Sequence, residues 1–124
     1  MSGQLDCKRI YDPPLETDGL RVLVDRLWPR GVRKADAHIR HWLKDVAPSP
    51  QLRTWFGHDP NRFAEFVKLY REELASDALH RQAVDQIVDW LQTDSVTLVY
   101  AARDTRHNHA VVLREYVIEG GYRE

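Results

Sequence analysis

The chain has 124 residues, of which 43% are hydrophobic and 30% charged, a composition typical of an ordinary globular domain. Its formal net charge of −1 excludes a uniformly basic protein that coats nucleic acid, and favours a small anionic ligand or a limited phosphate contact. We therefore expect one α/β domain over residues 1–124, with an oligomeric state that the sequence leaves open.

Cys7 is the single cysteine of the chain, so a disulfide within the chain is excluded and a reducing, cytoplasmic compartment is favoured. The N-terminal segment lacks the apolar region of a secretory signal. No run approaches the ~20 apolar residues that span a bilayer. We expect a cytoplasmic protein without membrane contact. Because Cys7 comes before the first expected strand, a role as nucleophile is disfavoured.

Two short strands are predicted in the first quarter of the chain. Residues 7–11 alternate polar and apolar side chains and are followed by Asp12, Pro13 and Pro14, which end a strand. Residues 20–26 contain an aliphatic run that suits a buried strand. The connection between them is too short for a helical crossover, so the two strands either pair antiparallel or are separated by another strand.

The middle of the chain is predicted to be helical. Ile39, Trp42 and Leu43 have helical spacing, and this helix is expected to stop near Val46 because prolines follow. A short turn at residues 52–56 should then precede two longer helices. The first, capped by Asn61, buries Phe63, Phe66, Val67, Tyr70 and Leu74, and the second, capped by Ser76 or Asp77, buries Leu79, Ala83, Val84, Ile87 and Leu91.

The last part of the chain predicts a strand, a polar loop and a helix. Residues 96–102 form a continuous apolar run, typical of a strand covered on both faces. A helix over residues 109–119 should follow, capped by Asn108 or Thr105 and ended by Gly120 and Gly121. The expected fold class is α/β, with a small, mostly parallel, few-stranded sheet, helices packed on it and a helical insertion before the last core strand.

Charged residues follow both apolar strands, where α/β proteins usually bind ligands. Arginine binds phosphate or carboxylate through paired hydrogen bonds, so we expect an anion pocket for a phosphorylated or nucleotide-like ligand. If it is catalytic, Asp25 or Asp104 would act as base and His107 as acid. The expected ligand-binding residues here are Arg26, Arg30, Arg103, Arg106 and Asn108. The alternative is that these charges form structural ion pairs.

The segment around residues 48–60 predicts a loop that packs onto the domain. Trp55 and Phe56 are expected to be largely buried, because an exposed aromatic pair would favour association. Arg53 and His58 are then expected at the rim of the anion pocket as a partial lid. The alternative is a structural plug without a ligand role. Trp28 is interpreted as filling space beside Pro29, and core packing is expected for Trp42 and Trp90.

Neither a metal nor a cofactor is predicted. His38 and His41, and likewise His107 and His109, are spaced closely enough to share a metal, but no cysteine or acidic residue completes a known ligand pattern. A different class of function is a non-enzymatic module that contacts nucleic acid or a protein partner through arginine and an exposed tryptophan. The net charge of −1 predicts that any nucleic-acid binding is weak and very sensitive to salt.

Nearly the whole chain resembles the YeaO-like proteins, small bacterial members of a widespread domain family of unknown function. The resemblance is carried above all by VLVDRLWPRG at residues 22–31 and LRTWFGH at residues 52–58, together with IYDPP, WLKDVAPS and VTLVYAARDTRHNHAVVL. It implies a cytoplasmic α/β protein with no assigned biochemical role. Longer relatives carry Asp-Val-Arg where this chain has Asp25-Arg26, and a Cys-His-Arg loop near residues 106–108, where this chain has no cysteine. The resemblance therefore implies anion binding at this corner without a thiol.

Overall fold

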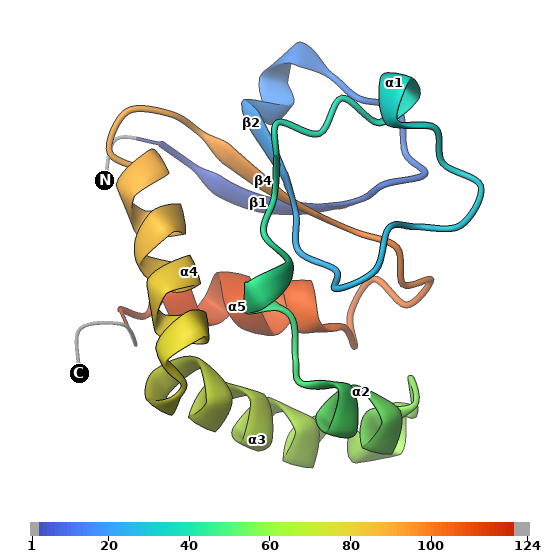
Figure 1. Ribbon diagram of the computed structural model, residues 1–124, viewed down its shortest axis with the longest axis vertical. Coiled ribbons are helices and arrows are strands. Elements are labelled where there is room, and N and C mark those ends of the chain that lie inside the picture. The colour runs from blue at the N-terminus through green and yellow to red at the C-terminus, as the bar shows by residue number, and fades with distance from the viewer. Residues whose placement is uncertain (1–2, 121–124) are drawn as a thin grey trace.

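The computed structural model describes residues 3–120, and a parallel four-stranded sheet lies at the centre of its fold (Figure 1). The strands are β1 (Leu5–Arg9), β2 (Leu20–Leu23), β3 (His41–Trp42) and β4 (Val96–Tyr100), in the order β1-β4-β2-β3. The predicted α/β class with a small parallel sheet is confirmed. So is the helical insertion before the last strand, because α2, α3 and α4 come between β3 and β4.

β1 and β2 are separated by β4, which pairs in parallel with both of them. Of the two arrangements that the short connection allowed, the antiparallel pair is therefore wrong. The connection contains a 3-10 turn, Glu16–Asp18, and then Gly19, which has a φ of 65°. A Cβ atom at Gly19 would lie 2.3 Å from the carbonyl oxygen of Ser95, so only glycine fits this close approach to β4.

The helix predicted to end near Val46 is wrong. Only α1, Lys34–Ala37, is helical, and it ends at His38, whose φ is 52°. The chain then forms β3 and a 3-10 turn, Lys44–Val46. The strand forms because residues 41–42 pair with β2 and the Trp42 indole N–H donates to the Asp25 carbonyl at 2.7 Å. These long-range bonds outweigh the local helical spacing.

The remaining helices are α2 (Pro50–Phe56), α3 (Phe63–Ser76), α4 (Ala78–Trp90) and α5 (His109–Ile118). The predicted N-caps of α4 and α5 are confirmed, because the side chains of Asp77 and Asn108 accept from the first turn of their helices. The Asn61 cap is wrong. Asp59 accepts from the Asn61 N–H and caps the 3-10 turn Pro60–Arg62, which continues into α3.

Several ends of elements differ from the prediction by a few residues. The first strand covers Leu5–Arg9 rather than residues 7–11, β2 stops at Leu23 and β4 at Tyr100. Gly120 follows α5 with a φ of 78°, whereas Gly121 lies outside the described residues. None of the helices between residues 3 and 120 has the length and apolar content needed to cross a bilayer.

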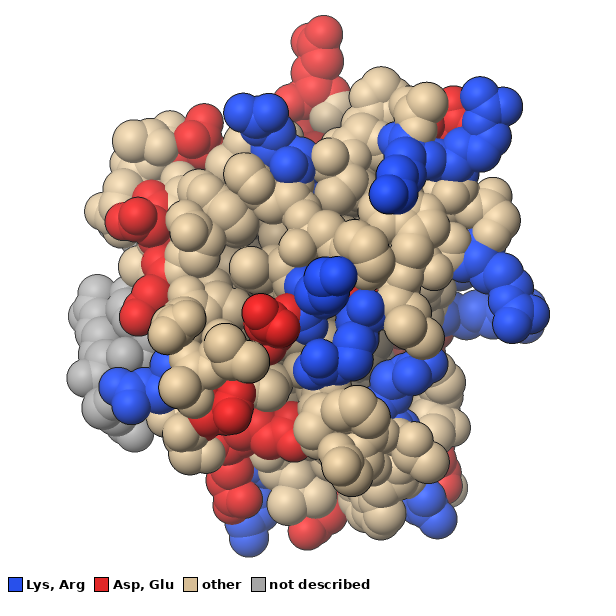
Figure 2. Space-filling view, viewed as in Figure 1, with Lys and Arg blue, Asp and Glu red and all other residues tan. Residues whose placement is uncertain are grey.

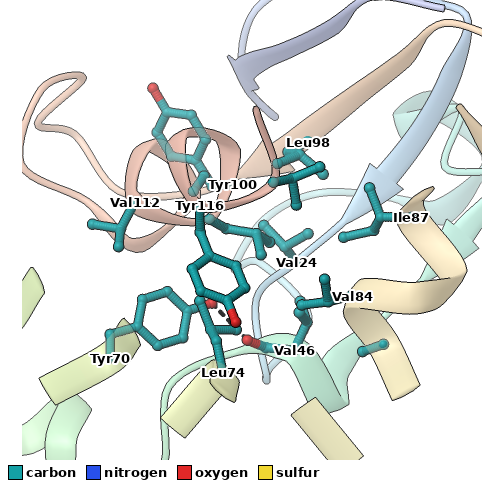
Figure 3. Packing of buried hydrophobic residues seen from close by; sticks show 14 of the residues in the cluster. Val24, Val46, Tyr70, Leu74, Val84, Ile87, Leu98, Tyr100, Val112 and Tyr116 are labelled. Atoms are coloured by element: carbon teal, nitrogen blue, oxygen red, sulfur yellow. Dashed lines mark hydrogen bonds between the residues drawn. The ribbon is translucent and has the colours of Figure 1, made fainter. Parts of the chain in front are cut away.

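Apolar side chains cover both faces of the sheet, which confirms the prediction for β4. Val22, Val24 and Leu98 belong to the larger core, into which α3, α4 and α5 also pack (Figure 3). Leu23 and Val99 point to a smaller core under the segment that follows β2. This alternation, which results from the period of two along a strand, fixes β2 and β4 rigidly between two apolar layers.

Candidate functional site

A pocket of about 700 Å³ lies where β2 and β4 end. It is bounded by the loop after β2, the loop between β4 and α5, the C-terminal part of α2 and the segment at Ala47 and Pro48. Figure 1 shows the first three of these on the same side of the molecule. On the face of the molecule that Figure 2 shows, Lys and Arg side chains gather in the middle and on the right, whereas most Asp and Glu side chains lie along the left and lower margin.

Most of the predicted site residues line this one pocket. They are Asp25, Arg26, Arg30, Arg53, His58, Arg103, Asp104 and Asn108. Arg106 and His107 are not part of the lining, because hydrogen bonds from their backbone N–H groups to Asp104 turn the loop there. Conversely, His109 lines the pocket although it was not among the predicted residues.

Both carboxylates of the pocket already hold protein groups. Asp25 accepts from the Ala101 N–H at 3.1 Å, and its other oxygen lies 3.0 Å from Nε2 of His109. Asp104 accepts from the N–H groups of Arg106 and His107 at 2.9 Å each, and the His107 ring lies 2.9 Å away. Asp25 therefore ties β2 to the end of β4, and Asp104 shapes the loop before α5.

Acid should weaken the loop that Asp104 shapes. The N–H of Arg106, the N–H of His107 and the His107 ring lower the pKa of Asp104 from 3.8 to about 2. Because the folded pKa lies below the unfolded one, the carboxylate contributes its full stability above pH 4 and loses it as the pH falls towards 2. We expect the melting temperature of Asp104→Asn to be below that of the wild type at pH 7, and the difference to shrink strongly by pH 2, where the carboxylate is about half protonated. A difference that stays constant from pH 7 to pH 2 would contradict this assignment.

Three arginines at the pocket have no counterion. Arg30, Arg53 and Arg103 are exposed, line the pocket and form no ion pair or side-chain hydrogen bond with any described residue. Several arginines elsewhere on the protein do have acidic partners, as in the Arg71–Glu119 pair at 2.9 Å, although Arg40 and Arg81 form no ion pair with any described residue. The lining contains four arginines, at positions 26, 30, 53 and 103, against the two carboxylates of Asp25 and Asp104, so the pocket carries an excess of positive charge.

Arg26 has a different environment. Its Nη2 donates to the carbonyls of Ala47 and Pro48 at 3.2 and 3.4 Å, so its guanidinium is tied to the wall of the pocket. Residues 46–49, which we call the strap, are held from behind as well. Tyr70 and His80 donate to the carbonyls of Val46 and Ala47.

The N-terminus of α2, which follows the strap directly, is anchored too. Glu73 accepts from the backbone N–H of Ser49 at 2.9 Å and from its hydroxyl at 2.5 Å. The same Ser49 hydroxyl accepts from the Leu52 N–H and caps α2. An irregular segment would otherwise leave these polar groups unpaired. The strap is therefore held as a fixed wall of the pocket by four side chains, those of Arg26, Tyr70, Glu73 and His80.

The loop predicted around residues 48–60 is wrong in its middle part, because Pro50–Phe56 form the helix α2. The side chains of this segment match the lid hypothesis in one respect and contradict it in another. Arg53 and His58 line the same pocket as Arg26 and Arg103. Phe56 is buried and stacks on Phe66 with 4.2 Å between ring centroids. Trp55, however, is 38% exposed, so its predicted burial is wrong. It points outwards with the Arg62 guanidinium 5.5 Å from its ring.

The other aromatic residues and the cysteine contribute to packing. Trp28 is half-buried, and its indole N–H donates to the Val32 carbonyl at 2.7 Å while its ring meets Trp42 edge to face. Trp42 and Trp90 are half-buried beside the two cores. The Cys7 thiol donates to the Ala110 carbonyl at 3.3 Å, and burial raises its pKa to about 12. This keeps the sulfur a thiol.

The fold and the pocket define a small parallel α/β protein with unpaired arginines at the carboxyl ends of its strands. Residues 4–124 match the family described as "Inactive DUF488-N3 subclade", and the chain belongs to this family. The resemblance to the YeaO-like proteins is confirmed by the uncharacterised protein YeaO of Escherichia coli. It is 41% identical to this chain over 113 residues, which are 91% of this chain and 96% of YeaO.

Two mycobacterial relatives agree with this assignment. Uncharacterised proteins of Mycobacterium tuberculosis and Mycobacterium bovis are each 44% identical over 107 residues, which are 86% of this chain and 87% of theirs. No solved structure was found to match the chain. The function of the family is unknown, so the proposals below rest on the pocket.

Proposed function

We propose that the protein binds a phosphorylated anion in the pocket at the ends of β2 and β4, without converting it. The observation that carries this proposal is the set of three exposed arginines, Arg30, Arg53 and Arg103, around a single pocket whose carboxylates are otherwise engaged. Guanidinium groups bind phosphate with paired, charge-assisted hydrogen bonds. An anion would provide the charge that the protein itself does not supply there.

Three further observations favour binding over catalysis. The family is described as inactive. The pKa of Asp104, which its hydrogen bonds from Arg106 and His107 lower to about 2, is far from the near-neutral value that suits a general base. His107 does not line the pocket. We therefore assign Asp25 and Asp104 to shaping the pocket rather than to proton transfer.

Titration with inorganic phosphate at pH 7, followed by calorimetry, tests this proposal. A charge-assisted hydrogen bond contributes about 1.5–3 kcal/mol, and about 1.4 kcal/mol corresponds to a tenfold change in affinity. We therefore expect Arg103→Ala to weaken phosphate binding about tenfold or more. Arg81→Ala is the matched control, because Arg81 is exposed on α4 and lies outside the pocket lining.

The proposal fails if phosphate does not bind to the wild-type protein. It also fails if Arg103→Ala and Arg53→Ala both bind phosphate as the wild type does. A loss in Arg81→Ala equal to that in Arg103→Ala would show general attraction to positive charge rather than a pocket. Binding through the pocket should weaken as salt is added, because the arginines are exposed.

A further inference from the structure

We infer that the ligand is a nucleoside phosphate, whose phosphate meets the arginines and whose base lies against the uncharged wall of the same pocket. This inference rests on the proposed anion binding and adds the rest of the ligand. The pocket has a volume of about 700 Å³, within the range of sites that enclose whole organic ligands, about 300–1,000 Å³. An isolated phosphate would leave most of it empty.

Part of the pocket lining is apolar. Pro48, Ala101 and Ala102 line it with small side chains. Leu27 lines it too and is 61% exposed, an unusual position for a large aliphatic side chain in a loop rich in charge. Small residues beside one exposed aliphatic side chain suit a flat ring, which buries Leu27 on binding.

One buried polar atom of the pocket lining, Nε of Arg26, has no hydrogen-bond partner among the described residues. The neighbouring oxygen Oδ1 of Asp25 lies 3.0 Å from Nε2 of His109 and is therefore not free in the same way. Buried polar atoms are nearly always paired, so the Arg26 N–H is expected to find an acceptor in the occupied pocket. Nucleobases carry such acceptors along their edges, which a simple alkyl or aryl phosphate does not.

Nε of Arg26 is shielded from solvent, so the inference requires the Arg26 side chain to turn when the base binds. Turning would break the bonds from its Nη2 to the carbonyls of Ala47 and Pro48. The Ala47 carbonyl also accepts from His80 at 2.7 Å, so the strap has an anchor that does not depend on Arg26.

Calorimetric titrations with four probes test this inference: inorganic phosphate, nucleoside 5′-monophosphates of the four common bases, the corresponding nucleosides, and a short 5′-phosphorylated single-stranded oligonucleotide. We expect at least one monophosphate to bind tenfold or more tightly than inorganic phosphate. If phosphate binds and no monophosphate binds more tightly, the inference fails while the proposed anion binding stands. If neither phosphate nor any monophosphate binds, both proposals fail. If a nucleoside binds as tightly as its monophosphate, the phosphate group does not contribute to binding, and the proposed anion binding fails.

The oligonucleotide distinguishes the two sources of a nucleoside phosphate. Equal affinity for the mononucleotide and the oligonucleotide supports a free nucleotide as the ligand. Tighter binding of the oligonucleotide supports the same recognition of base and phosphate at the end of a strand.

A pair of leucine variants separates the base from the phosphate. Leu27→Ala should weaken binding of the monophosphate several-fold and leave binding of inorganic phosphate unchanged, because Leu27 contacts only the base. Leu79→Ala is the control, since Leu79, whose predicted burial is wrong, is 54% exposed on α4 and lies outside the pocket lining. If Leu27→Ala and Leu79→Ala bind the monophosphate equally well, the base does not lie on the assigned wall and the inference fails.

Discussion

Replacement of Arg21 by methionine is expected to lower the free energy of unfolding by about 3–5 kcal/mol, the usual cost of removing one partner of a buried ion pair. Arg21 is 4% exposed and donates to Asp18 at 2.8 Å. It also donates twice to the Ala37 carbonyl, at 3.0 and 3.1 Å. Methionine fills much of the space but leaves Asp18 with Lys8 as its remaining cationic partner. Urea unfolding measures the difference.

Arg33→Met is a matched control for this variant. Arg33 and Asp36 form an ion pair with the same spacing of three residues, but their side chains are 80% and 69% exposed. Exposed pairs contribute about 0–1 kcal/mol. If Arg21→Met is no more destabilising than Arg33→Met, the network around Asp18 does not hold the β1–β2 connection in the way we describe.

Tyr70→Phe is expected to destabilise the protein by about 1–3 kcal/mol, because it leaves a buried carbonyl without its donor. Tyr70 is completely buried, and its hydroxyl donates to the Val46 carbonyl at 2.6 Å (Figure 3). Burial raises the pKa of Tyr70 well above 10.0, so the hydroxyl remains a donor over the accessible pH range. Val46 begins the strap, and the loss should therefore loosen the wall of the pocket.

Tyr11→Phe shows the cost of losing a hydroxyl at the surface. Tyr11 is 50% exposed, and its hydroxyl donates to the Arg30 carbonyl at 3.1 Å. When the hydroxyl is removed, a water molecule can donate to this carbonyl instead. Chemical denaturation of both variants should give a clearly larger loss for Tyr70→Phe. Equal losses would mean that the strap does not depend on Tyr70.

The elements that sequence reasoning predicted well are those whose signal is local. In α3, Phe66, Tyr70 and Leu74 repeat with helical spacing and are all buried. The cap at Asp77 and the apolar run of β4 are equally local features. β3 was missed for the opposite reason. Its two residues are a strand because they pair with β2, and this contact is invisible in their own sequence.

The candidate site was partly predictable because parallel strands end at the same edge of a sheet. Asp25, Arg103 and Asp104 follow β2 and β4 directly, and all three line the pocket. His109 was considered only as a possible metal ligand together with His107 and was not counted among the residues of the anion pocket. Its position directly after the Asn108 cap places it at the N-terminal end of α5, next to the same edge. That position was the signal that could have identified it.

The shape of the Asp104 loop was not predictable from composition. Arg106 and His107 were grouped with Arg103 because all three lie between β4 and α5. Hydrogen bonds from the N–H groups of residues 106 and 107 to Asp104 form a compact turn, and these two residues are left out of the pocket lining although Asn108 is part of it. The number of charges in the loop does not reveal which residue accepts these bonds.

A crystal structure of the protein soaked with tungstate, a heavy tetrahedral anion that stands in for phosphate, tests the central claim most directly. Tungsten can be located by its anomalous scattering without reference to the protein geometry. We predict a peak in the pocket at the ends of β2 and β4, within hydrogen-bond distance of at least two of Arg30, Arg53 and Arg103. Tungstate bound only at arginines outside the pocket, such as Arg40 or Arg81, or no bound tungstate at all, would contradict the claim.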